Sequence, residues 1–278
     1  MRKIEMSNLM AIFMLSIGFV ACEEEPKAPQ TPESIDIFAE LEKDEMIYVK
    51  GGTFTMGATS EQGTDEPYDD EYPTHQVTLS DFYIGKYEVT QQLWEYVMGT
   101  TPKYIPGNYL IPATGDYLPV ECVSWEDCQE FISKLNQMTG KAFRMPTEAE
   151  WEYAARGGNK SNGYKYSGSN SIGDVAWYYG NSSNYGNSSN SHEVGTKAPN
   201  ELGLYDMSGN VYEWCSDWFA TYSSSSQTNP TGPSSGSYRV LRGGNWECSA
   251  PICRVSSRNC NVPGSFYFYC GFRLACDL

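Results

Sequence analysis

The chain has 278 residues and carries 19 lysines and arginines against 35 aspartates and glutamates, a formal net charge of −16. This acidic balance excludes a nucleic-acid-binding protein, because phosphate recognition needs a basic face. Only His75 and His192 are histidines, which excludes a three-histidine metal site and an H-E-x-x-H zinc motif. Glycine (26) and tyrosine (21) are abundant while charged residues make up only 19%, so the composition favours a loop-rich globular domain.

The first residues resemble a bacterial lipoprotein signal. Arg2 and Lys3 precede an apolar stretch over residues 9–20, which is too short to span a membrane and has the length of a secretory core. Cys22 follows directly after this stretch, which predicts a signal peptide over residues 1–21 and lipid on Cys22. Secretion without lipid, to the periplasm or beyond, is the alternative, because Phe19 is a poor residue for a lipoprotein cleavage site.

Residues 22–45 predict an acidic, proline-rich tether between the lipid and a folded domain. This segment is polar and lacks an apolar period, so it is not expected to pack. The prediction is a protein of the bacterial cell envelope, held at the outer membrane or cell surface through its lipid anchor only. The residues that carry the prediction are Glu23, Glu24, Glu25, Pro26, Pro29 and Pro32.

Residues 46–278 read as one globular domain. Residues 46–57 predict two short strands joined by Gly51 and Gly52, and residues 76–85 alternate like a further strand. No internal repeat is apparent, so a single domain is the expected organisation.

Three helices are predicted from their capping residues. Thr90 is the expected N-cap of a helix over residues 91–98. Ser124 and Thr147 each open a capping box in which an acidic residue follows three positions later. These local signals predict where each helix begins.

Seven segments, in order along residues 46–276, resemble the formylglycine-generating enzyme (sulfatase-modifying factor) family. The resemblance implies a single α+β domain with an irregular, loop-rich fold related to C-type lectins. The segments are Gly51–Gly57, Tyr87–Gln91, Pro119–Trp125, Arg144–Gly158, Asn200–Trp214, Arg242–Trp246 and Gly271–Arg273.

The resemblance implies a copper site at Cys248 and Cys253. The family's oxidases convert a sulfatase cysteine to formylglycine with dioxygen and a copper ion held between two cysteines five positions apart, as these two are. Two thiolates are soft ligands that favour Cu(I). Three features depart from the enzymes: Asn245 replaces a serine, Tyr212 replaces a tryptophan, and the segment from Cys253 to Arg258 is shorter.

The alternative role of the cysteines is structural. Eight cysteines follow Cys22, an even number in a compartment expected to be oxidising, so disulfides are possible. Cys215 with Cys253, or Cys260 with Cys270, would be ordinary bridges. The sequence does not select among the pairings.

The resemblance also implies a calcium site on the segment before Trp214. Asp206 and Glu213 would supply side-chain oxygens, and Gly209 and Val211 would supply backbone carbonyls. Calcium prefers such a mixed oxygen shell on a tight turn. The alternative is that the two acids only cap and solvate the turn.

Two functions therefore stay open, beside a purely structural lipoprotein. One is an envelope-anchored copper oxidase that acts on a sulfatase-type polypeptide through Cys248 and Cys253. The other is a non-catalytic, calcium-stabilised surface module that binds a glycan or a protein. Residues 157–200 form a long loop whose aromatic side chains would make that contact. They are Trp177, Tyr178, Tyr179 and Tyr185.

Overall fold

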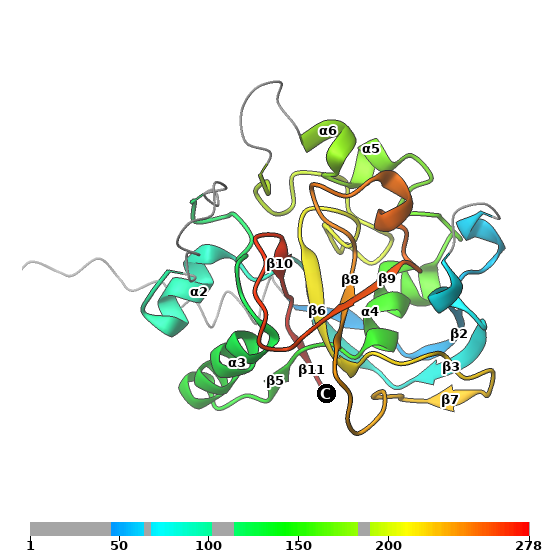
Figure 1. The fold of residues 1–278 in the computed structure, drawn as a ribbon, viewed down its shortest axis with the longest axis horizontal. Coiled ribbons are helices and arrows are strands. Elements are labelled where there is room, and N and C mark those ends of the chain that lie inside the picture. Colours follow the sequence, from blue (N-terminus) through cyan, green and yellow to red (C-terminus); the bar gives the residue numbers. More distant parts are fainter. Residues whose placement is uncertain (1–45, 64–67, 102–113, 183–189, 278) are drawn as a thin grey trace, which may run out of the picture. The chain divides into compact units, whose positions relative to one another are not determined.

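The computed structural model describes residues 46–63, 68–101, 114–182 and 190–277. The predicted signal peptide, the lipidation site Cys22, the tether and Tyr185 lie outside these residues. Within the described part, three small sheets and three helices of eight or more residues alternate with long irregular segments (Figure 1). None of the described helices is long and apolar enough to cross a membrane.

The first sheet joins the two ends of the domain. Its strand order is β1-β4-β11-β5, and all of its pairings are antiparallel. The strands are β1 (Met46–Val49), β4 (Phe82–Gly85), β11 (Ala275–Cys276) and β5 (Phe143–Arg144).

The second sheet carries the segments that lead to the predicted sites. Its order is β10-β6-β8-β9, and its long strand β6 is mostly buried. The strands are β10 (Cys270–Gly271), β6 (Tyr212–Trp218), β8 (Arg239–Arg242) and β9 (Arg258–Asn261). The predicted calcium turn precedes β6, and the predicted copper loop follows β8.

The third sheet shows how the chain changes sheets. It consists of β2 (Gly52–Met56), β3 (His75–Leu79) and β7 (Gln227–Thr228), in that order. The strands predicted on either side of Gly51 are present, but β1 and β2 belong to different sheets. The single strand predicted over residues 76–85 is in fact two, β3 and β4, again in different sheets. Asp81 lies at this crossing, where Oδ1 accepts a hydrogen bond of 2.8 Å from the backbone N–H of Gly51.

The capping residues predict the three main helices correctly. They are α2 (Gln91–Met98), α3 (Trp125–Thr139) and α4 (Glu148–Ala155). Thr90 Oγ1 accepts from the backbone N–H of Leu93, and both predicted capping boxes are formed. Six short helices lie in the connecting segments: η1 (Ser60–Gln62), η2 (Asp69–Glu71), η3 (Gly158–Lys160), α5 (Ile172–Val175), α6 (Tyr179–Ser182) and η4 (Ala250–Cys253).

Apolar packing around α3 and α4 makes up most of the core. The apolar face of α3 contributes Cys128, Phe131 and Leu135, and Phe131 stacks on Trp94 with ring centroids 5.3 Å apart. Cys128 is therefore a core thiol, as its position on the helix predicts. Every residue of α4 is buried, so this helix is enclosed on all sides.

Buried ion pairs connect segments that are far apart in the sequence. Four arginines on or beside the second sheet each bind a glutamate with both partners almost fully buried. Two of the glutamates belong to α4. A buried charge is costly without its partner, so each pair fixes the position of both segments. The pairs are Arg242–Glu152, Arg258–Glu148, Arg254–Glu71 and Arg273–Glu213.

The pair between Glu71 and Arg254 spans 183 residues of sequence. Burial alone would raise the pKa of Glu71, but hydrogen bonds from Arg254 and Ser256 bring that pKa below its ordinary value. Glu71 is therefore ionised in the folded domain and compensates the buried guanidinium.

We expect Glu71→Ala to lower the free energy of unfolding by about 3–5 kcal/mol, because Arg254 is then buried without a counter-charge. Glu130→Ala is the matched control, since it breaks an exposed ion pair with Lys134. The control should cost no more than about 1 kcal/mol. Urea unfolding followed by tryptophan fluorescence measures both, and equal losses would contradict the account.

Candidate functional site

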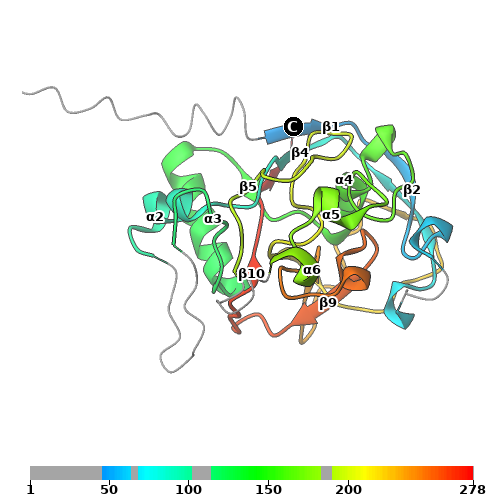
Figure 2. The same cartoon turned by 90° about the horizontal axis from the view of Figure 1, so that it is seen from above.

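The predicted copper pair lies in the loop after β8. Gly243 and Gly244 turn the chain with φ values of 91° and 73°, and η4 then ends at Cys253. A Cβ at Gly244 would lie 2.8 Å from Sγ of Cys253, so glycine lets the loop fold back against this sulfur. In Figures 1 and 2 the orange η4 segment lies beside α5 and α6.

Cys248 and Cys253 pack in one apolar cluster. Cys253 is fully buried in a cluster with Tyr166 and Val175, and Cys248 packs against the same cluster while it stays partly exposed. The thiol of Cys248 donates a hydrogen bond of 3.6 Å to Oη of Tyr212. The structure thus brings the two predicted residues together, with Cys248 on the solvent side.

Burial among apolar side chains keeps both thiols protonated at neutral pH. Burial raises the pKa of the Cys248 thiol. Burial also raises the pKa of Cys253, and the neighbouring Cys248 adds to this shift. A thiol must lose its proton to bind a metal ion, so metal binding here would release protons.

The two sulfurs fit Cu(I) as a donor set. They are soft ligands in an apolar pocket, which suits this soft ion better than a hard cation. No group of three or more histidine, cysteine, aspartate or glutamate side chains that could hold a metal occurs in the described part. A copper ion would therefore be held by Cys248 and Cys253 alone.

The structural alternative for the cysteines is not observed. All eight cysteines in the described part are free. Cys215, proposed as a partner of Cys253, packs instead in the apolar cluster beside α4, whereas Cys253 packs with Tyr166. Cys260 is partly exposed on β9, while Cys270 is buried in the cluster around α3. These placements leave Cys248 and Cys253 unbridged.

The four predicted calcium residues lie on the turn before β6 and at the start of that strand. Asp206 and Gly209 both have positive φ values, 58° and 81°. Glu213 points to Arg273, whose Nε and Nη2 lie 2.6 Å from its two carboxylate oxygens. Nε1 of Trp151 also donates to Glu213, at 2.7 Å. Both oxygens of Glu213 are therefore already hydrogen-bonded.

Asp206 retains a free acceptor. Its Oδ2 accepts from the backbone N–H of Gly195 at 2.7 Å, whereas its buried Oδ1 has no partner among the described residues. Burial raises the pKa of Asp206 to about 6. This unpaired oxygen of Asp206 is suited to bind a cation. Glu213 is less suited, because its oxygens already accept hydrogen bonds from Arg273 and Trp151. Calcium therefore stays a prediction that depends on Asp206.

The sequence analysis missed Glu88 next to this turn. Glu88 is buried and accepts from Nδ2 of Asn210 at 2.7 Å and from the backbone N–H of Val211 at 3.1 Å. Burial raises its pKa well above the ordinary value, and Asp206 adds to the shift. The signal was available, because Glu88 lies in the Tyr87–Gln91 segment that resembles the family.

Of the aromatic residues predicted to bind a ligand, Trp177 and Tyr178 are only partly exposed. Trp177 stacks on His192 with centroids 3.7 Å apart, and Nζ of Lys197 lies 4.0 Å from the ring of Trp177. Tyr178 packs against the cluster that contains Cys253. Tyr179 is 63% exposed, so within the described part of this set it is the residue best able to meet a partner.

A second group of aromatic residues packs against the same apolar cluster as Cys248. The rings of Tyr267 and Tyr269 stack 5.7 Å apart, and Tyr269 lies 6.2 Å from Tyr212. Cys248 packs against this cluster as well as against the one around Cys253. Cys248 therefore joins the two apolar clusters.

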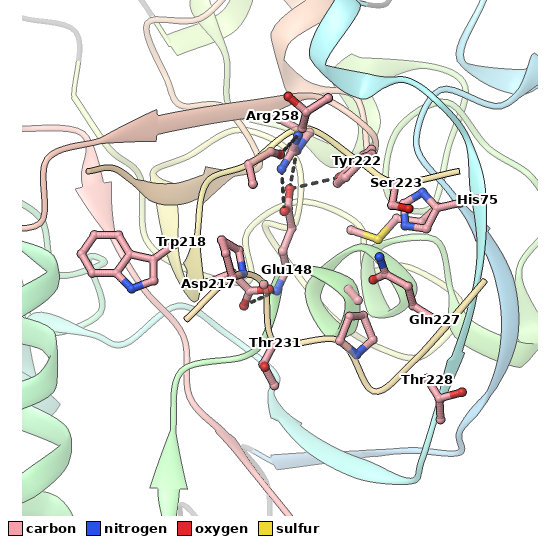
Figure 3. A pocket seen from close by; sticks show the side chains of 17 residues that line it. His75, Glu148, Asp217, Trp218, Tyr222, Ser223, Gln227, Thr228, Thr231 and Arg258 are labelled. Carbon is pink, nitrogen blue, oxygen red and sulfur yellow. Dashed lines mark hydrogen bonds and ion pairs between the residues drawn. The ribbon is translucent and has the colours of Figure 1, made fainter. Parts of the chain in front are cut away.

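The described residues also enclose a cavity of about 600 Å³ on another part of the domain. It lies beside the first turn of α4, the end of β6 and the segment after it (Figure 3). His75, at the start of β3, lines it and packs edge-on against Tyr222. The sequence analysis did not foresee this cavity, because its walls come from segments far apart in the chain.

Comparison with known proteins matches residues 32–278 to the family described as "Sulfatase-modifying factor enzyme 1-like domain". The chain is 33% identical to "Chaperone protein LppX" of Paenibacillus barcinonensis, over 80% of this chain and 84% of that protein. It is 31% identical to the formylglycine-generating enzyme of Thermomonospora curvata, over 84% of this chain and 93% of that protein.

Solved structures agree with the sequence comparisons. The domain superposes on Treponema denticola variable protein 1 with a TM-score of 0.71 at 35% identity, over 84% of this chain and 95% of that one. PvdO from Pseudomonas aeruginosa gives the same TM-score at 28% identity, over 84% of this chain and 94% of that one. The irregular α+β fold, the ordered motifs and these matches lead to one conclusion: the chain belongs to the formylglycine-generating enzyme (sulfatase-modifying factor) family.

Proposed function

We propose that this protein is an envelope lipoprotein whose Cys248–Cys253 pair binds Cu(I) and oxidises a cysteine of a sulfatase-type polypeptide to formylglycine. One observation carries the proposal: both cysteines are free and pack in one apolar cluster. Similarity to formylglycine-generating enzymes along most of the chain supports it.

The residues around the pair have distinct roles in this proposal. Bound copper would supply electron transfer to dioxygen. Cys248, the partly exposed ligand, would face the incoming polypeptide, and the Tyr212 hydroxyl would orient its sulfur. Tyr267 and Tyr269 would cover apolar parts of the polypeptide beside the pair, as aromatic side chains do at interfaces.

The N-terminal segment completes the proposal. Cys22 would carry the lipid, and residues 22–45 would hold the domain away from the membrane. An envelope location would provide dioxygen and access to exported polypeptides.

The second candidate is a non-catalytic binding module. Asn245 and Tyr212 stand where the enzymes have serine and tryptophan, and relatives of similar identity bear names other than formylglycine-generating enzyme. The favouring observation is the exposed ring of Tyr179, together with the stacked and partly exposed rings of Tyr267 and Tyr269. That surface would contact a glycan or a protein, and a calcium ion at Asp206 would fix the turn before β6.

We expect the reduced protein to bind one Cu(I) ion, measured by competition with a chromophoric Cu(I) chelator. Cys248→Ser and Cys253→Ser should each weaken binding by more than about 100-fold, because losing an outer-shell partner alone costs about 10–100-fold. Cys276→Ser is the matched control, since Cys276 is a partly exposed free thiol on β11. Unchanged affinity in either pocket variant would refute the copper site.

The affinity for Cu(I) should depend on pH. Both thiols have raised pKa values, so Cu(I) must displace two protons at neutral pH. The apparent affinity should therefore rise as pH rises from 6 to 8, by up to about 100-fold per pH unit. An affinity independent of pH would show that the ion binds groups other than these thiols.

The two candidate functions predict different products. With Cu(I), dioxygen and a thiol reductant that supplies the two further electrons needed to form water, the oxidase should convert the cysteine of a Cys-x-Pro-x-Arg peptide to an aldehyde. The sulfur leaves as sulfide, and mass spectrometry detects the product. Cys253→Ser should abolish this conversion. Binding of the peptide or of a glycan by the copper-loaded protein without conversion would instead support the binding module.

A further inference from the structure

The cavity beside α4 has a partly charged lining that the proposed function does not use. It measures about 600 Å³, which suits a small ligand or a side chain of a partner. Figure 3 shows side chains from distant segments facing it. Those that matter for its chemistry are His75, Glu148, Asp217, Gln227, Thr231 and Arg258.

Two of the charges in this lining cancel each other. Nε and Nη2 of Arg258 lie 2.6 and 2.8 Å from the two oxygens of Glu148 (Figure 3). Nη1 of Arg258 donates to the backbone carbonyls of Asp70 and Ala220. The hydroxyl of Tyr222 donates to Glu148 as well. This ion pair is therefore complete without a ligand.

Asp217 has no such compensation. It is only 5% exposed, and its Oδ2 accepts from the backbone N–H of Glu148 and the hydroxyl of Ser216. No described residue donates a hydrogen bond to its Oδ1. A Cβ at position 232 would lie 3.3 Å from that oxygen, so Gly232 leaves it uncovered. One oxygen of a buried aspartate in the cavity wall is thus open to a donor.

The surrounding charges do not supply that donor. Arg239, on β8, acts on Asp217 electrostatically, but no ion pair joins these two described residues. The guanidinium of Arg239 is held between Trp125 and Trp218, at 3.8 and 3.6 Å from their rings, and donates to the carbonyl of Ser216. Burial raises the pKa of Asp217 to about 7, and the carboxylates of Glu148 and Glu150 add to the shift.

We propose that this cavity binds a primary ammonium group, such as a lysine side chain of a partner polypeptide, with Asp217 as its counter-ion. An ammonium is a compact charge with three donors, and the neutral side chains of Gln227 and Thr231 offer further acceptors in the same lining. The net charge of −16 attracts cations to the domain. The inference is independent of the thiol pair.

The test titrates the full-length protein with Nα-acetyl-lysine amide at pH 8, followed by calorimetry and by NMR shifts of Thr231 and Gly232. The neutral probe is Nα,Nε-diacetyl-lysine amide, in which acetylation removes the charge of the side chain. We expect the cationic probe to bind at least tenfold more tightly than the neutral one. Its binding should weaken as pH falls from 8 to 6, because Asp217 then takes up a proton.

Two variants complete the test. Asp217→Asn keeps the shape of the side chain and should weaken the cationic probe at least tenfold. Asp116→Asn removes an equal charge from an exposed position outside the cavity and should leave binding unchanged. Equal binding of the two probes to the wild-type protein would overturn the proposal without any variant. Unchanged binding by a correctly folded Asp217→Asn protein would also overturn it.

Discussion

The structure depends on buried arginine–glutamate pairs. Its strands are short, so backbone hydrogen bonds alone connect few of its segments. The α4 helix lies at the centre because Glu148 and Glu152 bind Arg258 and Arg242, at the two ends of the connection that carries Cys248 and Cys253. A buried pair gives little net stability, but it penalises any arrangement that separates the partners. The pairs thereby favour one arrangement of the long irregular segments.

In this arrangement the two candidate sites differ in their electrostatics. The thiol pocket is apolar, so it opposes ionisation of Cys248 and Cys253 until a soft cation arrives. The cavity beside α4 has a complete ion pair and one extra carboxyl, Asp217, which lacks a cation. One site would therefore bind by releasing protons from sulfur, and the other by compensating a charge.

The sequence predicts those features that depend on neighbouring residues. Thr90, Ser124 and Thr147 identify three helices, because a cap acts within one turn. The proximity of Cys248 and Cys253 is instead implied by the resemblance to the family, not by local signals. The strands near Gly51 could be located but not paired, since pairing depends on distant segments. Asp217 and its cavity could not be predicted, because α4, β6 and the following segment meet only in the folded domain.

The most direct measurement of the central claim is the redox state of the two pocket cysteines in freshly purified protein. The protein is denatured in the presence of an alkylating reagent, which labels the free thiols. It is then reduced and treated with a second reagent of different mass, which labels thiols released from disulfides. Peptide mass spectrometry locates both labels. We expect Cys248 and Cys253 both to carry the first label. Either cysteine carrying the second label, with a bridged peptide in the unreduced sample, would contradict it.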